Sequence, residues 1–103
     1  LSDNDTNTFL IGYIVFYIYD DYAYLVNIAV AEKFQGKRYG RLMIEKMNGV
    51  CHKNQCKKII LDVNKANHNA IMFYQKNGFD IVKIKETNDS KKQYLMELIF
   101  DEE

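Results

Sequence analysis

Two apolar segments separated by only two residues constrain the fold of this chain more than any other feature of its sequence. Residues 9–19 and 22–30 are dense in β-branched and aromatic side chains, which favours strands, and neither approaches the roughly 18 residues of a membrane span. Asp20 and Asp21 between them mark a turn. Because so short a connection joins antiparallel neighbours, the sequence predicts a β-hairpin.

The rest of the chain predicts two helices among further strands. Apolar residues recur at helical spacing in residues 39–53. Asn67 and Gly78 are residue types that cap the start and the end of a short second helix. Three further strands are expected, at residues 57–63, 79–85 and 93–100. The resulting order, β-β-α-β-α-β-β, predicts one mixed α/β (α+β) domain that spans residues 1–103.

The helix at 39–53 connects the strand at 22–30 to the strand at 57–63. A strand, helix and strand in this order are expected to form a right-handed parallel crossover. Ligands of such sheets bind at the carboxyl ends of the strands, where helix N-termini gather. The segment that follows Val30 is therefore the first place to look for a binding site.

Length and composition exclude several classes of protein and site. A chain of 103 residues can bury a core without a metal or a disulfide. Its 14 basic and 14 acidic residues balance, so we expect neither nucleic acid nor a membrane as a partner. Cys51 and Cys56, with His52 and His68, form no recognisable ligand pattern. We therefore expect no metal, and two reduced structural thiols in a cytoplasmic protein.

Glycines and cations gather in the stretch "KFQGKRYGRL", between the strand at 22–30 and the helix at 39–53. Free amides in the first turn of a helix, surrounded by cations, form an anion site, so phosphate is the first candidate ligand. A tight turn with a solvated basic face is the alternative. The stretch is not a Walker loop, because G-K-[ST] is absent, and G-x-G-x-x-G cannot be aligned with it.

The stretch resembles the pyrophosphate loop of the GNAT superfamily of acyl-CoA-dependent N-acyltransferases, [QR]-x-x-G-x-[GA]. Gln35 matches the first position and Gly40 the last, whereas Arg38 replaces the glycine between them. We expect the loop to tolerate this arginine provided that its φ stays negative. A second family signature, N-x-x-A-x-x-x-Y-x-x-x-G-F, is matched at every stated position by "NHNAIMFYQKNGF", residues 67–79. Within the superfamily the pattern is most similar to the ribosomal-protein alanine N-acetyltransferases.

The resemblance covers residues 9–100 and implies a GNAT-like fold with acetyl-CoA as co-substrate. It implies that the backbone of residues 28–30 separates from the neighbouring strand and forms hydrogen bonds with the pantetheine arm. It also implies that residues 35–41 hold the pyrophosphate. Asn67 would touch the pantetheine and Tyr74 would lie beside the CoA sulfur. The expected coenzyme-binding residues are Ile28, Ala29, Val30, Gln35, Gly36, Lys37, Arg38, Tyr39, Gly40, Arg41, Asn67 and Tyr74.

Two residues are candidates for proton transfer. A tyrosine hydroxyl, with a pKa of about 10, stays protonated until the thiolate forms, so Tyr74 is the expected proton donor; a core aromatic is the alternative. Asp62 falls where the resembling enzymes carry a glutamate that is proposed as general base. It is expected to take the amine proton, directly or through water, and a solvated strand carboxylate is the alternative. Glu32 ranks third as a base, and His52 and His68 are expected at the surface.

These features predict an acetyl-CoA-dependent N-acetyltransferase that moves the acetyl group directly to a primary amine. A protein N-terminus is the first expected acceptor, and a small-molecule amine such as a polyamine or an aminoglycoside is the second. Relatives usually carry a strand and helices before the hairpin, and these form one wall of the acceptor cleft. Either that segment precedes the sequence given, or the protein is a shortened member whose acceptor cleft is open or completed by another subunit, as in a homodimer. A degenerate CoA-binding or interaction module is the remaining alternative, supported by Arg38 and by the lack of that wall.

Overall fold

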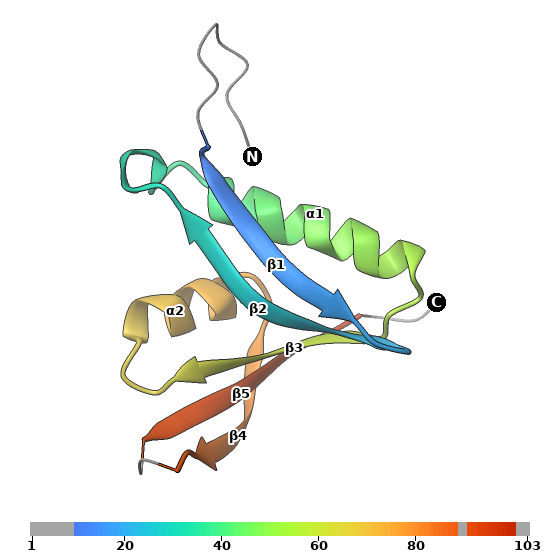
Figure 1. Cartoon of the computed structure of the whole chain (residues 1–103), viewed down its shortest axis with the longest axis vertical. Helices are drawn as coiled ribbons and strands as arrows, with labels where there is room; N and C mark the ends of the chain where they lie inside the picture. The colour runs from blue at the N-terminus through green and yellow to red at the C-terminus, as the bar shows by residue number, and fades with distance from the viewer. Residues whose placement is uncertain (1–9, 89–90, 101–103) are drawn as a thin grey trace, which may run out of the picture.

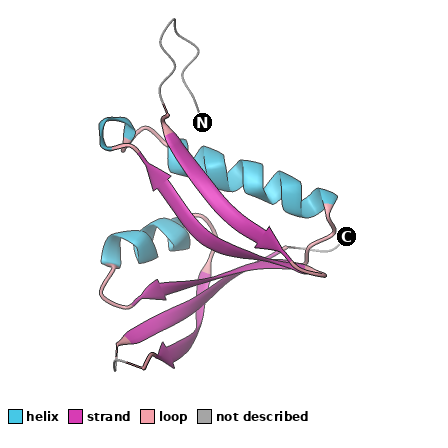
Figure 2. Cartoon of the chain, in the orientation of Figure 1, coloured by secondary structure: helices cyan, strands magenta, loops and turns pink. Residues whose placement is uncertain are grey.

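The computed structural model describes residues 10–88 and 91–100 and shows a five-stranded mixed sheet with two helices (Figures 1 and 2). The elements are β1 (Gly12–Ile18), β2 (Tyr22–Val30), a 3₁₀ turn (Glu32–Phe34), α1 (Tyr39–Lys53), β3 (Lys58–Asn64), α2 (His68–Lys76), β4 (Asp80–Glu86) and β5 (Lys92–Ile99). The predicted order of strands and helices is confirmed. No helix in the described part of the chain is long and apolar enough to cross a membrane.

The predicted bounds agree closely with the observed ones. β2 and α1 begin and end where the sequence predicted, and the bounds of β3, β4 and β5 each differ by one residue. β1 begins only at Gly12, and residue 9, where the strand was expected to start, lies outside the described residues. Asn67 caps α2, because its Oδ1 accepts a hydrogen bond from the amide of Ala70 at 3.3 Å, and Gly78 follows with φ +96°. The 3₁₀ turn after β2 was not predicted.

The sheet has the strand order β1-β2-β3-β5-β4, and among the strands of the described residues only β2 and β3 pair in parallel. This confirms a parallel crossover through α1. Both helices pack on one face of the sheet, where Ile59 and Leu61 of β3 meet Ile44 of α1 and Ile71 of α2 in one core. Cys51 and Cys56 are also buried there as free thiols. Burial raises the pKa of Cys51 to about 12, which makes it unreactive, as expected of a structural thiol.

The two parallel strands separate soon after they meet. β2 pairs with β3 only from Tyr22 to Tyr24, opposite residues 58–60. Two residues further on, β2 bulges: Phe16 of β1 pairs with Leu25 and Val15 with Asn27, so Val26 is extra. A bulge bends its strand and increases the local twist. The carboxyl half of β2 therefore diverges from β3, and α2 lies in the opening (Figure 1). This is the separation expected at residues 28–30.

Candidate functional site

The N-terminus of α1 presents free amides at the mouth of this opening. The first helical bond is donated by Leu42 to the carbonyl of Arg38, so the amides of Tyr39, Gly40 and Arg41 have no carbonyl partner within the helix. The side chain of Arg38 does not cap them, and the first turn contains no acid. These amides and the positive end of the helix dipole make an anion site.

The loop before α1 is shaped by two residues with left-handed backbone. Gly36 has φ +81° and Arg38 has φ +66°. Glycine adopts this region freely, whereas a residue with a Cβ is strained there by about 1–2 kcal/mol. The condition under which the loop was expected to tolerate Arg38, a φ that is not positive, is therefore not met. Gln35 holds the loop to the end of β2, because its Nε2 donates a hydrogen bond to the carbonyl of Val30 at 3.0 Å.

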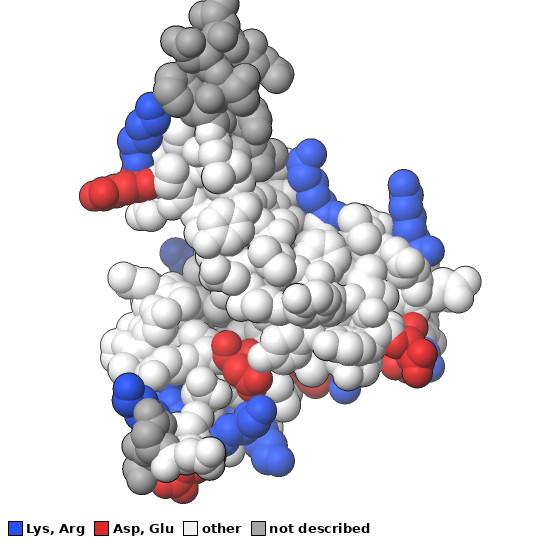
Figure 3. Space-filling view, in the orientation of Figure 1, with Lys and Arg blue, Asp and Glu red and all other residues white. Residues whose placement is uncertain are grey.

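A cleft of about 700 Å³ lies between the carboxyl end of β2, this loop and α2. The molecule is visibly hollowed on that side in the space-filling view (Figure 3). Most of the expected coenzyme residues line the cleft, namely Ile28, Ala29, Val30, Gln35, Gly36, Arg38, Tyr39, Gly40 and Arg41. Lys37 does not line it and instead extends past the ring of Phe34, with 5.9 Å between Nζ and the ring centroid.

Sequence reasoning missed the far wall of the cleft. This wall is supplied by α2 and its C-terminal end, through Asn69, Ala70, Phe73, Lys76 and Asn77, and Phe34 adds to the loop side. The α2 residues recur at intervals of three and four, which places them on one face of a helix. That spacing, within a segment already matched to a coenzyme-binding signature, was the signal that could have found them.

The cleft is cationic although the chain as a whole is neutral. Its lining includes Arg38, Arg41 and Lys76 and no aspartate or glutamate. Arg41 also pairs with Glu45 one turn along α1, at 3.3 Å between Nε and Oε1. Formal net charge is zero over the full sequence. The positive charge is therefore concentrated at the α1 N-terminus, as a site for phosphate groups requires.

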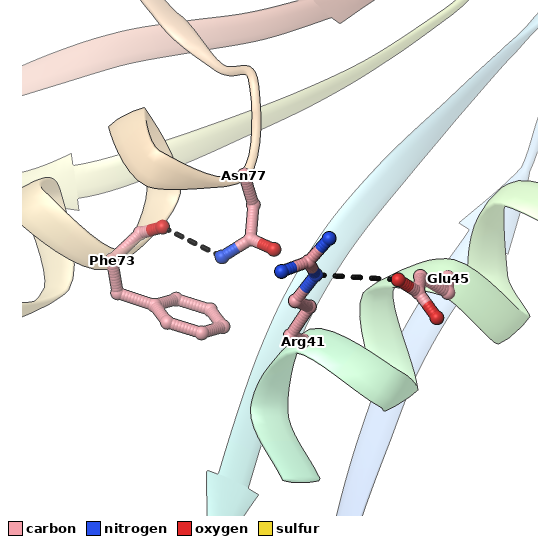
Figure 4. A network of polar contacts seen from close by, with 4 residues as sticks. All are labelled: Arg41, Glu45, Phe73 and Asn77. Atoms are coloured by element: carbon pink, nitrogen blue, oxygen red, sulfur yellow. Dashed lines mark hydrogen bonds and ion pairs between the residues drawn. The ribbon is translucent and has the colours of Figure 1, made fainter. Parts of the chain in front are cut away.

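Gly40 allows α1 and α2 to approach closely at this site. A Cβ at Gly40 would lie 2.9 Å from two ring carbons of Phe73. Figure 4 shows Phe73 and Asn77 of the α2 side pointing toward Arg41 of α1, with the Nδ2 of Asn77 donating to the carbonyl of Phe73 at 2.8 Å. The missing side chain at Gly40 thus fixes the spacing of the two cleft walls.

Tyr74 is packed beside the cleft and is not part of its lining. Its half-buried ring makes edge and tilted contacts with Phe73 and Phe79, with centroid separations of 5.5 and 5.7 Å. Burial raises its pKa above the usual 10, so the hydroxyl stays protonated at neutral pH. The ring of Tyr74 therefore packs as a core aromatic does, which was the alternative to a catalytic role. Its role as proton donor stays a prediction. The pantetheine contact of Asn67, which caps α2, also stays a prediction.

Asp62 lies on the sheet face opposite the core, since its neighbours Leu61 and Val63 are buried in the core. Its Oδ2 accepts a hydrogen bond from the hydroxyl of Tyr24 at 2.8 Å, and its Oδ1 accepts one from Nζ of Lys85 at 3.2 Å. Only 17% of its side chain is exposed. Asp62 is therefore a partnered carboxylate, not a solvated one, and its catalytic role stays a prediction. Its two partners were missed because they lie on distant strands.

The remaining candidates lie at the surface. His52, His68 and Glu32 are exposed, as expected for the two histidines, and His52 packs against Phe100 with 4.5 Å between ring centroids. Among residues 10–88 and 91–100, no three His, Cys, Asp or Glu side chains come together as a metal site.

A family model described as the acetyltransferase (GNAT) family matches residues 1–79. The chain belongs to this family. Solved structures with GNAT folds include Ard1 from Thermoplasma volcanium, with 29% sequence identity and a TM-score of 0.81, covering 89% of this chain and 64% of that one. A search of curated proteins gives no match.

Two further GNAT-like structures resemble this chain. The ribosomal-protein-S18-alanine N-acetyltransferase from Escherichia coli is 26% identical, with a TM-score of 0.78 over 90% of this chain and 63% of that one. A Bacillus anthracis protein described as a streptothricin acetyltransferase, solved with acetyl coenzyme A, is 27% identical, with a TM-score of 0.82 over 88% and 56% of the two chains. This chain thus spans less than two thirds of the length of each of these three structures.

Proposed function

We propose that this chain transfers an acetyl group from acetyl-CoA directly to a primary amine. The observation that carries the proposal is the cationic cleft at the α1 N-terminus, placed where β2 leaves β3. The fold, the family and a relative solved with acetyl coenzyme A support the same co-substrate. A neighbouring cleft of about 390 Å³, lined by Lys37, Arg38 and Arg41 among others, is smaller and includes the acidic Glu45.

The lining of the cleft supports binding of two parts of coenzyme A, its phosphates and its pantetheine arm. The phosphates would bind the amides of residues 39–41 and the nearby Arg38, Arg41 and Lys76. Beyond Tyr24, the edge of β2 that faces β3 has no strand partner. The pantetheine amides would bond to this edge at residues 28–30, as an added strand does.

Besides binding, the reaction needs a polarised thioester carbonyl, a proton donor for the thiolate and an acceptor for the amine proton. A backbone N–H of β2 would polarise the thioester carbonyl, which requires no particular side chain. The neutral amine nitrogen bonds to the acetyl carbon, the C–S bond breaks, and the amine gives up one proton while the thiolate gains one. Tyr74 would supply the thiolate proton and Asp62 would receive the amine proton, directly or through water.

A protein N-terminus is the first proposed acceptor, supported by the likeness to the ribosomal-protein-S18-alanine N-acetyltransferase. A small-molecule amine is the second, supported by the likeness to the protein described as a streptothricin acetyltransferase. A binding module without turnover is the third, and the strained Arg38 at the α1 N-cap favours it.

Calorimetry and a thiol-release assay separate these alternatives. Isothermal titration with acetyl-CoA and with desulfo-CoA should show binding of both, because the phosphates and the pantetheine arm provide the contacts. A thiol-release screen over N-terminal peptides, polyamines and aminoglycosides should then show amine-dependent turnover. Binding without turnover on any amine would favour the binding module, and absence of binding would contradict the proposed function.

A further inference from the structure

Three polar side chains from three different strands meet on the helix-free face of the sheet. Tyr24 of β2 and Lys85 of β4 each donate a hydrogen bond to a different oxygen of Asp62 on β3. The side chain of Asp62 is 17% exposed and that of Lys85 is 44% exposed, so the pair is partly shielded from solvent. Residues this distant in sequence meet only because the sheet order brings β2, β3 and β4 to one surface.

The cluster lies where β2 and β3 part. Tyr24 is the last residue of β2 that pairs with β3, opposite Ile60, and Asp62 is the next residue of β3 on the same face. The hydrogen bond between them therefore spans the inner end of the opening, and Val30 and the coenzyme cleft mark its outer end.

The distance between these ends fits the proposed co-substrate. From Val30 back to Val26, which follows Tyr24 on β2 as Asp62 follows Ile60 on β3, a strand advances roughly 13 Å at the usual rise per residue. The length of an extended pantetheine arm, from phosphate ester to sulfur, is of this order. With its phosphates at the α1 N-terminus, acetyl-CoA laid along β2 would bring its thioester close to the inner end of the opening, beside the cluster.

We propose that Tyr24 and Lys85 are positioning residues that hold the carboxylate of Asp62 fixed to receive the proton of the acceptor amine. This assignment rests on the proposed function. The two hydrogen bonds use one lone pair on each oxygen, and a carboxylate accepts about four, so Asp62 keeps free sites for an amine or a water. Because the two donors come from different strands, they fix the direction in which those free sites point.

The side chains around Asp62 include one hydroxyl donor and several charged groups. Burial, followed by the hydrogen bond to Asp62, raises the pKa of Tyr24 to about 12, so its hydroxyl remains a donor throughout the neutral range. The strand register places Lys83 of β4 and Leu95 of β5 in one row with Asp62. Glu97 of β5 is on the same face and pairs with Lys58 at 3.8 Å.

The test compares kcat and KM of the full chain and its variants, with the amine found in the thiol-release screen. Tyr24→Phe keeps the ring and removes only the donor, and Lys85→Met removes the second donor and its charge. Each should lower kcat by roughly tenfold, as expected when a base is no longer held in place, and the double variant should lower it further. Acetyl-CoA affinity should be unchanged in all of them.

Two controls match these variants. Tyr17→Phe alters the cross-strand neighbour of Tyr24 on the same face, and Lys58→Met breaks the neighbouring ion pair with Glu97. Neither should lower kcat. In an Asp62→Asn background, Tyr24→Phe should have no further effect on kcat, because the group that it positions is already lost.

An unchanged kcat in folded Tyr24→Phe and Lys85→Met proteins, with chemistry limiting, would overturn this assignment alone. Equal losses of kcat in the two controls would also overturn it, because they would show a general effect of the surface. If the wild-type protein turns over no amine, the proposed function fails and the assignment fails with it. Should Tyr24→Phe not fold, Lys85→Met decides, because Lys85 lies on the exposed strand β4.

Discussion

At the start of α1, single residues are constrained by quite different forces. Gly40 is small because of packing, since a Cβ there would meet the ring of Phe73. Gly36 is a glycine because of its backbone, which has φ +81°, while a Cβ at this position would meet only open space. Arg38 also has a left-handed backbone, with φ +66°, but it is not a glycine. A loop that binds an anion through its amides needs all three backbones in place, whatever the side chains are.

Arg38 provides a direct test of this strain. Arg38→Gly should be more stable than Arg38→Ala by about 1 kcal/mol, because both remove the guanidinium and only glycine relieves the positive φ. Urea unfolding of the two variants measures the difference. Equal stabilities would show that the backbone at this position is not left-handed. A large gain in acetyl-CoA affinity for Arg38→Gly would show that the arginine obstructs the cleft and would favour the binding module.

Tyr74 carries the prediction about the leaving thiolate. Tyr74→Phe keeps the ring contacts with Phe73 and Phe79, so stability and acetyl-CoA affinity should change little. Turnover should fall by roughly 10²- to 10⁴-fold, as for a lost general acid. Tyr94→Phe, at another tyrosine packed against the core, is the matched control. Because burial raises the pKa of Tyr74, the wild-type rate should not decline through this group as pH rises from 7 to about 10. An unchanged rate in Tyr74→Phe, with chemistry limiting, would leave Tyr74 a core aromatic.

At the scale of elements, the site is made by the start of one helix facing the end of another. α1 contributes amides and Arg41, and α2 contributes Lys76 and the side chains around it. Neither helix alone could enclose an anion. The gap between them exists because β2 and β3 pair over only three positions before they part.

The cations around the gap should differ in their effect on binding. Lys76→Met should weaken acetyl-CoA binding about fivefold at low salt, and less at high salt, because Lys76 lines the cleft and exposed charges are screened. Lys37→Met removes the same group from outside the cleft lining and should have a smaller effect. Calorimetric titrations at two ionic strengths measure both. Equal losses would show that the phosphates are attracted by the general basic surface of the loop.

Much of this arrangement could be predicted because it depends on local sequence. The bounds of β2 and α1 follow from apolar periodicity, and the cap at Asn67 follows from residue type. The left-handed φ of Arg38 could not be predicted, because the pattern of the loop overrides the preference of the residue. The partners of Asp62 could not be predicted either, since they depend on the strand order, which places β4 at the far edge.

At the scale of the whole molecule, the coenzyme is expected to act as part of the fold. It would bridge α1, β2 and α2, which together line the cleft. At a hundredfold excess over Kd, acetyl-CoA should add about 2.7 kcal/mol of stability, which raises Tm by roughly 10–20 °C for a chain of this size. Pantetheine, which lacks the phosphates, should give a much smaller rise. A melting curve unmoved by saturating acetyl-CoA would contradict binding at this site.

The parting of β2 from β3 also bears on how the protein behaves in storage. Within the described part of the chain, the carboxyl half of β2 has β1 on one side and no strand on the other. An open strand edge is a template for aggregation, because any extended chain can complete its hydrogen bonds. A ligand that lies along this edge competes with such a chain. Preparations without acetyl-CoA are therefore expected to precipitate first, and the proposed coenzyme would serve the solubility of the protein as well as its chemistry.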